Sequence, residues 1–232
     1  MIIALNNKSN LGKEEFQQYM QELEKIDCQD TMILCPNHLN INSYSSKKCH
    51  LGAQNVSRTG NGAYTGEISS EQLKSYNVEY CIIGHSERRQ YQKESLEDIH
   101  EKLLKLIENQ ITPILCIGES LEERNNNKVE EVLKKELLTA VEGLTDAEKE
   151  KIIIAYEPIW SIGTGIIPTN EQIKEVFHLI KTLLPNIKVL YGGSANEENI
   201  DVLREIKEID GYLLGGLSLK PEKLKIFIEK CH

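Results

Sequence analysis

The sequence predicts an α/β fold in which eight parallel strands close into a barrel, with helices on the outside, in a single domain. Short apolar runs alternate with amphipathic segments along the chain, and polar or glycine residues follow most of the apolar runs. Strands that alternate with helices imply right-handed crossovers and a parallel sheet, and eight such units close into a barrel. The 232 residues are enough for one such domain, and no linker-like stretch divides residues 1–232.

The strand candidates are short apolar runs bounded by turn-forming residues. They cover residues 2–5, 32–35, 50–54, 80–83, 113–117, 152–155, 188–191 and 212–214. The strongest helix candidates lie between them, at residues 12–26, 96–109, 129–141, 170–183, 196–205 and 220–230. Thr169 and Gln172 have the spacing of a capping box before one helix, whereas the link at residues 36–48 is short and rich in Asn and Ser.

The composition excludes several classes of protein. A formal net charge of −9 with scattered lysines argues against nucleic-acid binding. The apolar runs are far too short to cross a bilayer, and residues 1–5 do not begin a signal-like segment, so we expect a cytoplasmic protein without membrane contact. The six cysteines form no C-x-x-C pair and the histidines lack ligand spacing, so we expect reduced thiols and no metal.

The stretch at residues 152–166 reads IIIAYEPIWSIGTGI, an apolar strand that runs into an acid, a proline and a glycine-rich loop. Glu157 ends the strand, and Pro158 stops the regular structure. Because the loop is bounded by Pro158 and by the capping box at Thr169, we expect a mobile segment with fixed ends. Taken alone, Glu157 would be interpreted as a solvated acid, but the other strand ends change that interpretation.

Polar residues and glycines follow the predicted strands at their carboxyl ends, where barrels of this kind carry their active sites. These residues are Asn6-Asn7-Lys8 after the first strand, residues 84–89 after the fourth, Glu157 after the sixth, residues 192–194 after the seventh and Gly215-Gly216 after the eighth. A single Gly-Gly pair predicts only a turn. Two pairs after the last two strands predict a phosphate site, because backbone N–H groups there commonly hold an anion.

Seven segments resemble the triosephosphate isomerase family over nearly the whole chain. They are ALNNK at 4–8, GAQNVS at 52–57, GAYTGE at 62–67, IIGHSERR at 82–89, YEPIWSIGTG at 156–165, YGGSA at 191–195 and GYLLGG at 211–216. The resemblance implies a (β/α)8 TIM barrel and an aldose-ketose isomerase of glycolysis and gluconeogenesis. Such an enzyme interconverts dihydroxyacetone phosphate and D-glyceraldehyde 3-phosphate through an enediolate, without a cofactor or a metal.

By this resemblance, Glu157 is the base that moves a proton between adjacent carbons, and His85 is the electrophile beside the carbonyl oxygen. The residue types suit these tasks. Partial desolvation raises the basicity of a carboxylate, and a helix that begins at Ser86 disfavours the imidazolium form of His85. The family is itself the standard example of this pKa tuning, so the assignment comes from the resemblance.

The resemblance also assigns contacts to the substrate and residues that support the site. The substrate contacts are Asn6 and Lys8, and the backbone contacts to phosphate are Gly163, Ser194, Gly215 and Gly216. Gly163 would arrive when the loop at residues 158–166 closes as a lid over the substrate. Glu87 and Cys116 match supporting residues beside the site.

The segment at residues 58–67 matches the family's loop that inserts beside a partner's active site. The resemblance therefore implies a homodimer, in which Thr65 supports Asn6 and Lys8 of the neighbouring subunit. Departures from the family pattern occur at Asn7, Ser9, Ser161 and Ile166. None of them removes a reacting group.

Two other interpretations stay open on the sequence. Another phosphate-binding barrel enzyme, such as a pentose-phosphate epimerase, would need a metal cluster or paired acids at several strand ends, and neither pattern is found. A catalytically silent barrel that acts as a phosphate-binding or interaction protein would show damage at Lys8, His85 or Glu157. All three are present.

Overall fold

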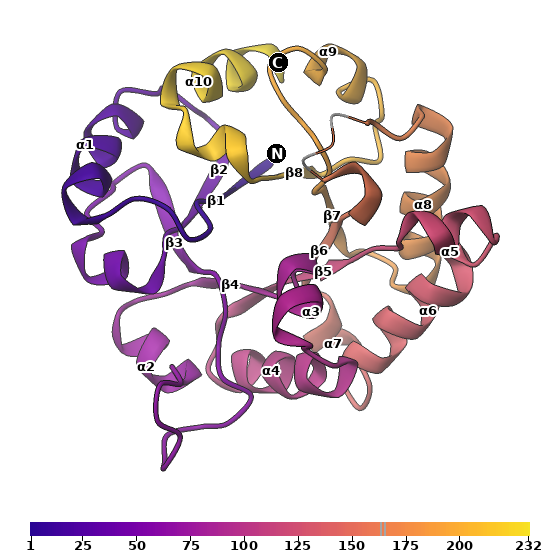
Figure 1. The fold of residues 1–232 in the computed structure, drawn as a ribbon, viewed down its shortest axis with the longest axis horizontal. Coiled ribbons are helices and arrows are strands. Elements are labelled where there is room, and N and C mark those ends of the chain that lie inside the picture. Colours follow the sequence, from indigo (N-terminus) through magenta and orange to yellow (C-terminus); the bar gives the residue numbers. More distant parts are fainter. Residues whose placement is uncertain (163, 165) are drawn as a thin grey trace.

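Eight parallel strands form a closed barrel in sequence order, and the helices surround it (Figure 1). The structure is a computed structural model that describes residues 1–162, 164 and 166–232. The strands are β1 (Ile2–Asn6), β2 (Thr31–Cys35), β3 (Cys49–Ala53), β4 (Tyr80–Ile83), β5 (Thr112–Ile117), β6 (Ile153–Tyr156), β7 (Lys188–Tyr191) and β8 (Gly211–Leu214). The predicted fold class is confirmed, with each strand within one residue of its expected position.

The predicted helices are all present, and further short ones follow several strands. The predicted set is α1 (Lys13–Leu23), α4 (Leu96–Glu108), α6 (Val129–Ala140), α8 (Asn170–Leu183), α9 (Ile200–Leu203) and α10 (Pro221–Lys230). The others are η1 (His38–Ser43), α2 (Ser70–Ser75), α3 (Ser86–Gln92), α5 (Leu121–Asn125), α7 (Asp146–Lys149), η2 (Ile159–Ser161) and η3 (Gly216–Leu219). In the described part of the chain, no helix combines the length and apolarity needed to cross a bilayer.

Helix α9 is much shorter than the predicted helix at residues 196–205. The side chain of Asn196 accepts hydrogen bonds from the backbone N–H groups of Glu198 and Asn199, at 2.8 and 3.1 Å. Asn side chains that bond nearby backbone groups in this way compete with helical hydrogen bonds. The chain therefore forms a turn at Asn196, and regular helix begins only at Ile200.

The core has two layers, because the parallel strands are buried on both faces. One layer lies between the strands and the surrounding helices. The other fills the barrel interior and consists of Ala4, Ile33, Cys35, Ile82, Ile114, Cys116, Ile153, Ala155, Leu190 and Leu213. The interior is thus a packed core, and the open space for chemistry is confined to the loops at the ends of the strands.

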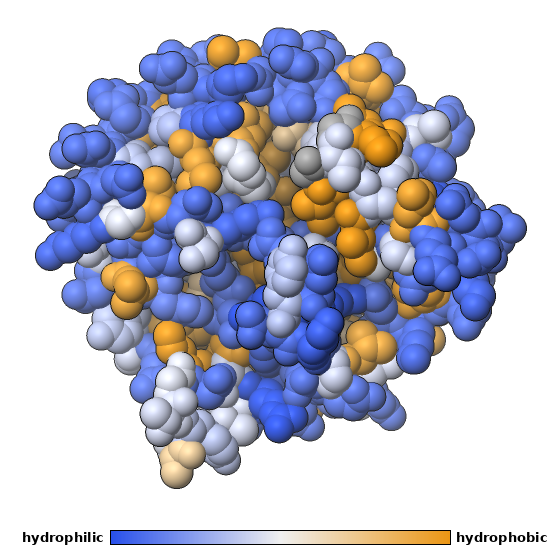
Figure 2. Space-filling model, in the orientation of Figure 1, coloured by the Kyte–Doolittle hydropathy of each residue, from blue (hydrophilic) through white to orange (hydrophobic). Residues whose placement is uncertain are grey.

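The loops at the carboxyl ends differ in how far they leave the barrel. The connection between β3 and α2 projects away from the body of the molecule (Figure 1), and residues 61–67 within it are exposed. Figure 2 shows a mainly hydrophilic face in the same orientation, with hydrophobic residues in a hollow near its centre. The hollow and the projecting loop are therefore separate features of one chain.

The seam between β8 and β1 depends on a residue without a side chain. Gly211 pairs with Ile2, and a Cβ atom added to Gly211 would lie 1.9 Å from the carbonyl oxygen of Ile2. We expect Gly211→Ala to lower the free energy of unfolding by about 3 kcal/mol or more, because the two backbones would have to separate. Urea denaturation measures this change.

The matched control is Gly12→Ala, where an added Cβ makes only an ordinary contact, 3.5 Å from the Glu15 carboxylate. Its cost at this helix cap should stay below about 1 kcal/mol. Equal denaturation midpoints for Gly211→Ala and the unsubstituted protein would contradict the role of this glycine in closing the barrel.

Candidate active site

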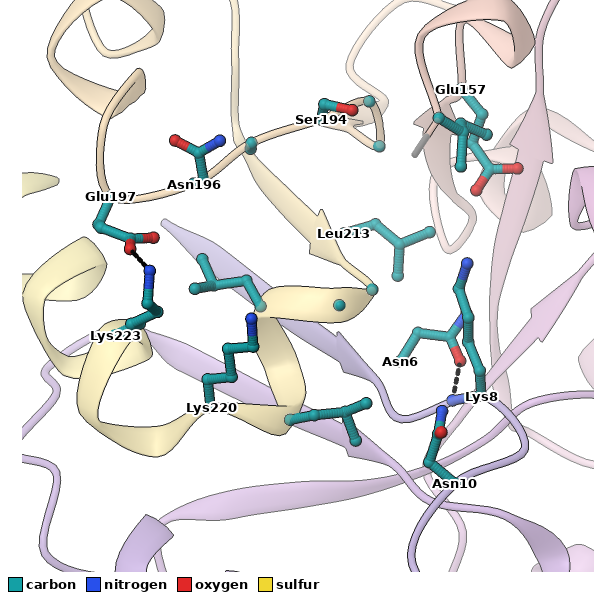
Figure 3. Close-up of a pocket in the computed structure, with 18 of the residues that line it drawn as sticks. Asn6, Lys8, Asn10, Glu157, Ser194, Asn196, Glu197, Leu213, Lys220 and Lys223 are labelled. Atoms are coloured by element: carbon teal, nitrogen blue, oxygen red, sulfur yellow. Dashed lines mark hydrogen bonds and ion pairs between the residues drawn. The ribbon is translucent and has the colours of Figure 1, made fainter. Parts of the chain in front are cut away.

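A cavity of about 520 Å³ lies at the carboxyl ends of the strands (Figure 3). It is lined by the end of β1, by residues that follow β1, β4 and β6, and by the loops after β7 and β8. The predicted residues that line it are Asn6, Lys8, His85, Glu157, Ser194, Gly215 and Gly216. Residues far apart in the sequence thus meet in one place, as the predicted strand ends require.

Glu157 and His85 form a direct pair in this cavity. The Glu157 Oε1 atom lies 3.1 Å from His85 Nε2, and its Oε2 atom accepts a hydrogen bond from the backbone N–H of Ser86 at 3.1 Å. Glu157 is 3% exposed and His85 is 6% exposed. The carboxylate is therefore held by two donors in a site that largely excludes water.

Burial raises the pKa of Glu157, but the His85 ring and the Ser86 N–H act against it, and the pKa lies below its ordinary value of 4.5. We expected from the sequence that desolvation would make this carboxylate more basic. Desolvation is present, but the two donors outweigh it while Glu157 stays in this position. The base is therefore weak until the hydrogen bond from His85 is given up.

His85 precedes α3 and caps it, as the predicted helix start at Ser86 requires. The Nδ1 atom of His85 accepts a hydrogen bond from the backbone N–H of Glu87 at 3.3 Å. A ring nitrogen that accepts carries no proton, so in the neutral ring Nε2 carries the proton and faces the Glu157 carboxylate. His85 is thus placed to donate a hydrogen bond into the cavity.

The pKa of His85 does not follow the expectation from the helix start alone. Burial lowers it, but the Glu157 carboxylate raises it further, and the pKa lies above the ordinary value of 6.5. The helix N-terminus was expected to disfavour imidazolium. In this arrangement the adjacent carboxylate is the larger influence, so the ring is most easily neutral when Glu157 has moved away.

The backbone of Glu157 is held tightly between its neighbouring strands. Its N–H donates to the carbonyl oxygen of Ile117 at 2.7 Å, and a Cβ added to Gly118 would lie 1.7 Å from the Glu157 carbonyl oxygen. Only glycine permits so close an approach of two backbones. The position of the carboxylate is therefore fixed by packing at the end of β5.

Lys8 enters the cavity from a strained turn after β1. Its φ angle is 52°, in the left-handed region, and its N–H donates to the Asn6 side chain at 3.0 Å. Its ammonium nitrogen lies 2.6 Å from a carboxylate oxygen of Glu87. The supporting role predicted for Glu87 thus has a structural basis, because Glu87 holds the ammonium group near His85.

Three residues whose backbone N–H groups are free to bind an anion line the same cavity. In the described part of the chain, the N–H groups of Ser194, Gly215 and Gly216 donate no hydrogen bond. We call these three groups the N–H cradle. Gly215 lies next to Lys8, since a Cβ on Gly215 would approach the Lys8 Cε atom to 3.1 Å. Gly163, also predicted to contact phosphate, lies outside the described residues, so its role and the closure of the lid stay predictions.

Two further predicted residues have different placements. Cys116 is buried on β5, where burial raises the pKa of its thiol well above the ordinary value and the Glu157 carboxylate adds to the effect. Its thiol therefore stays neutral beside Glu157, and its supporting role remains a prediction. Thr65 is exposed on the projecting loop and is not brought to the cavity of its own chain.

Arg89, which was not predicted from the sequence, holds together the strand ends around His85. Its guanidinium donates to the carbonyl oxygens of Gly84 at 2.8 Å and Cys116 at 2.5 Å and forms an ion pair with Glu136. A second oxygen of Glu136 accepts from the N–H of Gly118 at 2.9 Å. The position of Arg89 shortly after β4 was the only sequence feature that could have indicated its role. Its partner Glu136 lies 47 positions away in the chain, on α6, so the pairing could not be predicted.

Glu119 was missed as well. It is fully buried, and one of its oxygens lies 2.9 Å from the Trp160 indole nitrogen, 2.7 Å from Arg124 Nε and 3.1 Å from the Tyr156 hydroxyl. This cluster ties η2 to the loop after β5. Ser161, in the same turn, donates its hydroxyl to the carbonyl oxygen of Ile166 at 2.6 Å.

The arrangement is suited to proton transfer next to a carbonyl group. A carboxylate base, an N–H donor for a developing oxyanion, an ammonium group and an N–H cradle for an anion converge in one buried cavity. Among residues 1–162, 164 and 166–232, no group of three or more His, Cys, Asp or Glu side chains is placed to hold a metal ion.

Comparison with known proteins agrees with this geometry. A family model described as triosephosphate isomerase matches residues 1–231. The triosephosphate isomerase of Francisella tularensis subsp. holarctica (strain LVS) is 42% identical over 194 residues, which cover 80% of this chain and 77% of that protein. That of Clostridium botulinum (strain Langeland / NCTC 10281 / Type F) is 38% identical over 242 residues, covering 98% of each. The chain belongs to the triosephosphate isomerase family.

Proposed function

We propose that this chain interconverts dihydroxyacetone phosphate and D-glyceraldehyde 3-phosphate, with Glu157 as the base and His85 as the hydrogen-bond donor. The observation that carries the proposal is the buried pair of Glu157 and His85, 3.1 Å apart, in one cavity with Lys8 and the N–H cradle. Family membership supports the same reaction.

Substrate binding would change the base from weak to strong. The phosphate binds to the N–H cradle, and the substrate carbonyl oxygen takes the hydrogen bond from His85 Nε2 that Glu157 accepts in the free protein. Glu157 then loses the larger of the two donors that lower its pKa, while the desolvation that raises its pKa stays. Binding of the correct substrate therefore releases an active base next to the carbon that it must deprotonate.

The proton transfer needs no cofactor. Glu157 removes a proton from the carbon next to the carbonyl group, and the electron pair moves to the oxygen, which gives an enediolate. The His85 N–H and the Lys8 ammonium stabilise the negative charge as it develops. The proton of the neighbouring hydroxyl group passes to the enediolate oxygen by way of His85 Nε2, Glu157 returns its proton to the adjacent carbon, and the carbonyl group forms at the other position.

The second candidate is a catalytically silent barrel that binds phosphate or a partner. Such a protein would have no need to keep a proton acceptor and a proton donor in contact inside the cavity. Lys8, His85 and Glu157 all line that cavity. Isomerisation is therefore the better supported function.

We also propose a cytoplasmic homodimer. The six cysteines are free thiols, which suits a reducing compartment. Residues 61–67 project from the barrel with their side chains exposed, including Tyr64 at 50% exposure, as expected of a loop that a partner covers. Thr65 in this loop would support Asn6 and Lys8 of the partner.

Replacement of the base gives the first test. We expect Glu157→Gln to lower kcat by at least about 100- to 10,000-fold, because the amide cannot accept the proton. Binding of inorganic phosphate, followed by calorimetry, should be unchanged. Glu175→Gln, on the exposed side of α8, is the control and should keep full turnover. Near-normal turnover in Glu157→Gln would exclude this residue as the base.

The same variant tests the electrostatics of the pair. In the unsubstituted protein the pKa of His85 lies above 6.5 because of the Glu157 carboxylate. Without that charge, burial remains and should bring the pKa below 6.5. NMR titration of the His85 ring, identified by its absence in His85→Gln, measures the shift. An unchanged titration in Glu157→Gln would mean that the carboxylate does not control the ring.

The proposed dimer is tested by mass and by loop deletion. Sedimentation should give twice the chain mass of 26.4 kDa at assay concentrations. Deletion of residues 61–66 should give a folded monomer with reduced turnover, because the partner no longer supports Asn6 and Lys8. A fully active monomer of the complete chain would contradict the proposal.

A further inference from the structure

Lys220 stands at the mouth of the active-site cavity and has no role in the mechanism described above. It precedes α10, is exposed to solvent and lines the same cavity as Glu157 and Lys8. Figure 3 shows its side chain extending from the α10 end of the cavity toward the side where Ser194 and Asn196 lie. Lys220 therefore lines the same cavity as the three residues of the N–H cradle.

The three lysines that line the cavity differ in their pairing. Lys8 lies 2.6 Å from a carboxylate oxygen of Glu87, and Lys223 forms an ion pair with Glu197. Within the described ranges, Lys220 forms neither an ion pair nor a side-chain hydrogen bond. Among the three lysines, Lys220 is thus the one whose ammonium group no carboxylate of these ranges contacts within ion-pair distance.

The backbone of Lys220 is held by hydrogen bonds in the turn that follows Gly215 and Gly216. Its backbone N–H donates to the carbonyl oxygen of Leu217 at 3.0 Å, within the turn that follows η3. The Ser218 hydroxyl in η3 donates to the Asn6 carbonyl oxygen at 3.0 Å, which ties this turn to β1. Because η3 begins at Gly216, two members of the cradle, Gly215 and Gly216, and the backbone of Lys220 belong to one hydrogen-bonded turn.

A cation in this place has an electrostatic task. The protein carries a formal net charge of −9, so its overall field repels a phosphate dianion. An unpaired ammonium group at the rim raises the local concentration of the anion and directs its approach. Charges at the rim of a site mainly change the rate of association and the dependence of that rate on salt, and they change the rate of the chemical step little.

We propose that Lys220 is a substrate-recruiting residue that draws the phosphate group of the substrate to the cradle of Ser194, Gly215 and Gly216. The inference rests on the proposed isomerase function, and it adds a second cation to the phosphate end of the site. Lys8 acts near the reacting oxygen, whereas Lys220 acts on the group that does not react.

The test compares Lys220→Met, Lys220→Arg and Lys225→Met with the unsubstituted protein. Lys225 lies on the exposed side of α10, away from the cavity, so its replacement makes the same change in net charge. Two quantities are measured for each protein: kcat and KM for triose phosphate isomerisation at several ionic strengths, and the affinity for inorganic phosphate by calorimetry.

We expect Lys220→Met to lower kcat/KM by about five- to twentyfold through KM, with kcat kept, and to flatten the dependence on salt. The phosphate affinity should fall by a similar factor. Lys220→Arg should restore both quantities, and Lys225→Met should change neither.

Equal losses in Lys220→Met and Lys225→Met, or no loss in either, would overturn the role of Lys220. A loss in kcat that arginine does not restore would also overturn it, since that outcome indicates a structural effect. Failure of the proposed function appears differently, because the unsubstituted protein would then show no isomerisation. Phosphate binding still reports on Lys220 in that case.

Discussion

One buried hydrogen bond, from His85 to Glu157, governs the catalytic end of this barrel. It couples two ionisable groups that have lost most of their contact with water, so each sets the protonation of the other. The bond keeps the carboxylate charged and the ring protonated at Nε2, and it lowers the basicity of the Glu157 carboxylate. The other features of the cavity either hold these two residues in place or bind the ligand that would replace their hydrogen bond.

The contacts that hold His85 and Glu157 in place are mostly polar, and they join the strand ends to helices. Arg89 joins the ends of β4 and β5 to α6 through Glu136, and Gly118 allows Glu157 to approach β5. Removal of one partner from such a buried ion pair typically costs about 3 to 5 kcal/mol, because the other charge is left unpaired. The precision of the site therefore depends on residues that never meet the substrate.

The sequence predicted the barrel well because its strands are uninterrupted apolar runs and its active residues follow them directly. His85, Glu157, Lys8 and the glycines after β8 were found for this reason. The pKa directions of the central pair were not predicted correctly, since they depend on a distance between residues 72 positions apart in the chain (157 − 85). Arg89 and Glu119 were not predicted because their roles depend on partners in other helices and loops. Helix α9 was predicted too long because a turn at Asn196 takes the place of its first residues.

The cluster around Glu119 has a spectroscopic consequence. Trp160 is the only tryptophan of the chain, and its indole N–H is bound to Glu119 while the Arg124 guanidinium lies 5.5 Å from its ring centre. When the protein is excited in the indole absorption band, its fluorescence therefore comes from Trp160 in the turn after β6. A change in that emission on adding a ligand reports on the environment of η2 alone, with no need for a label.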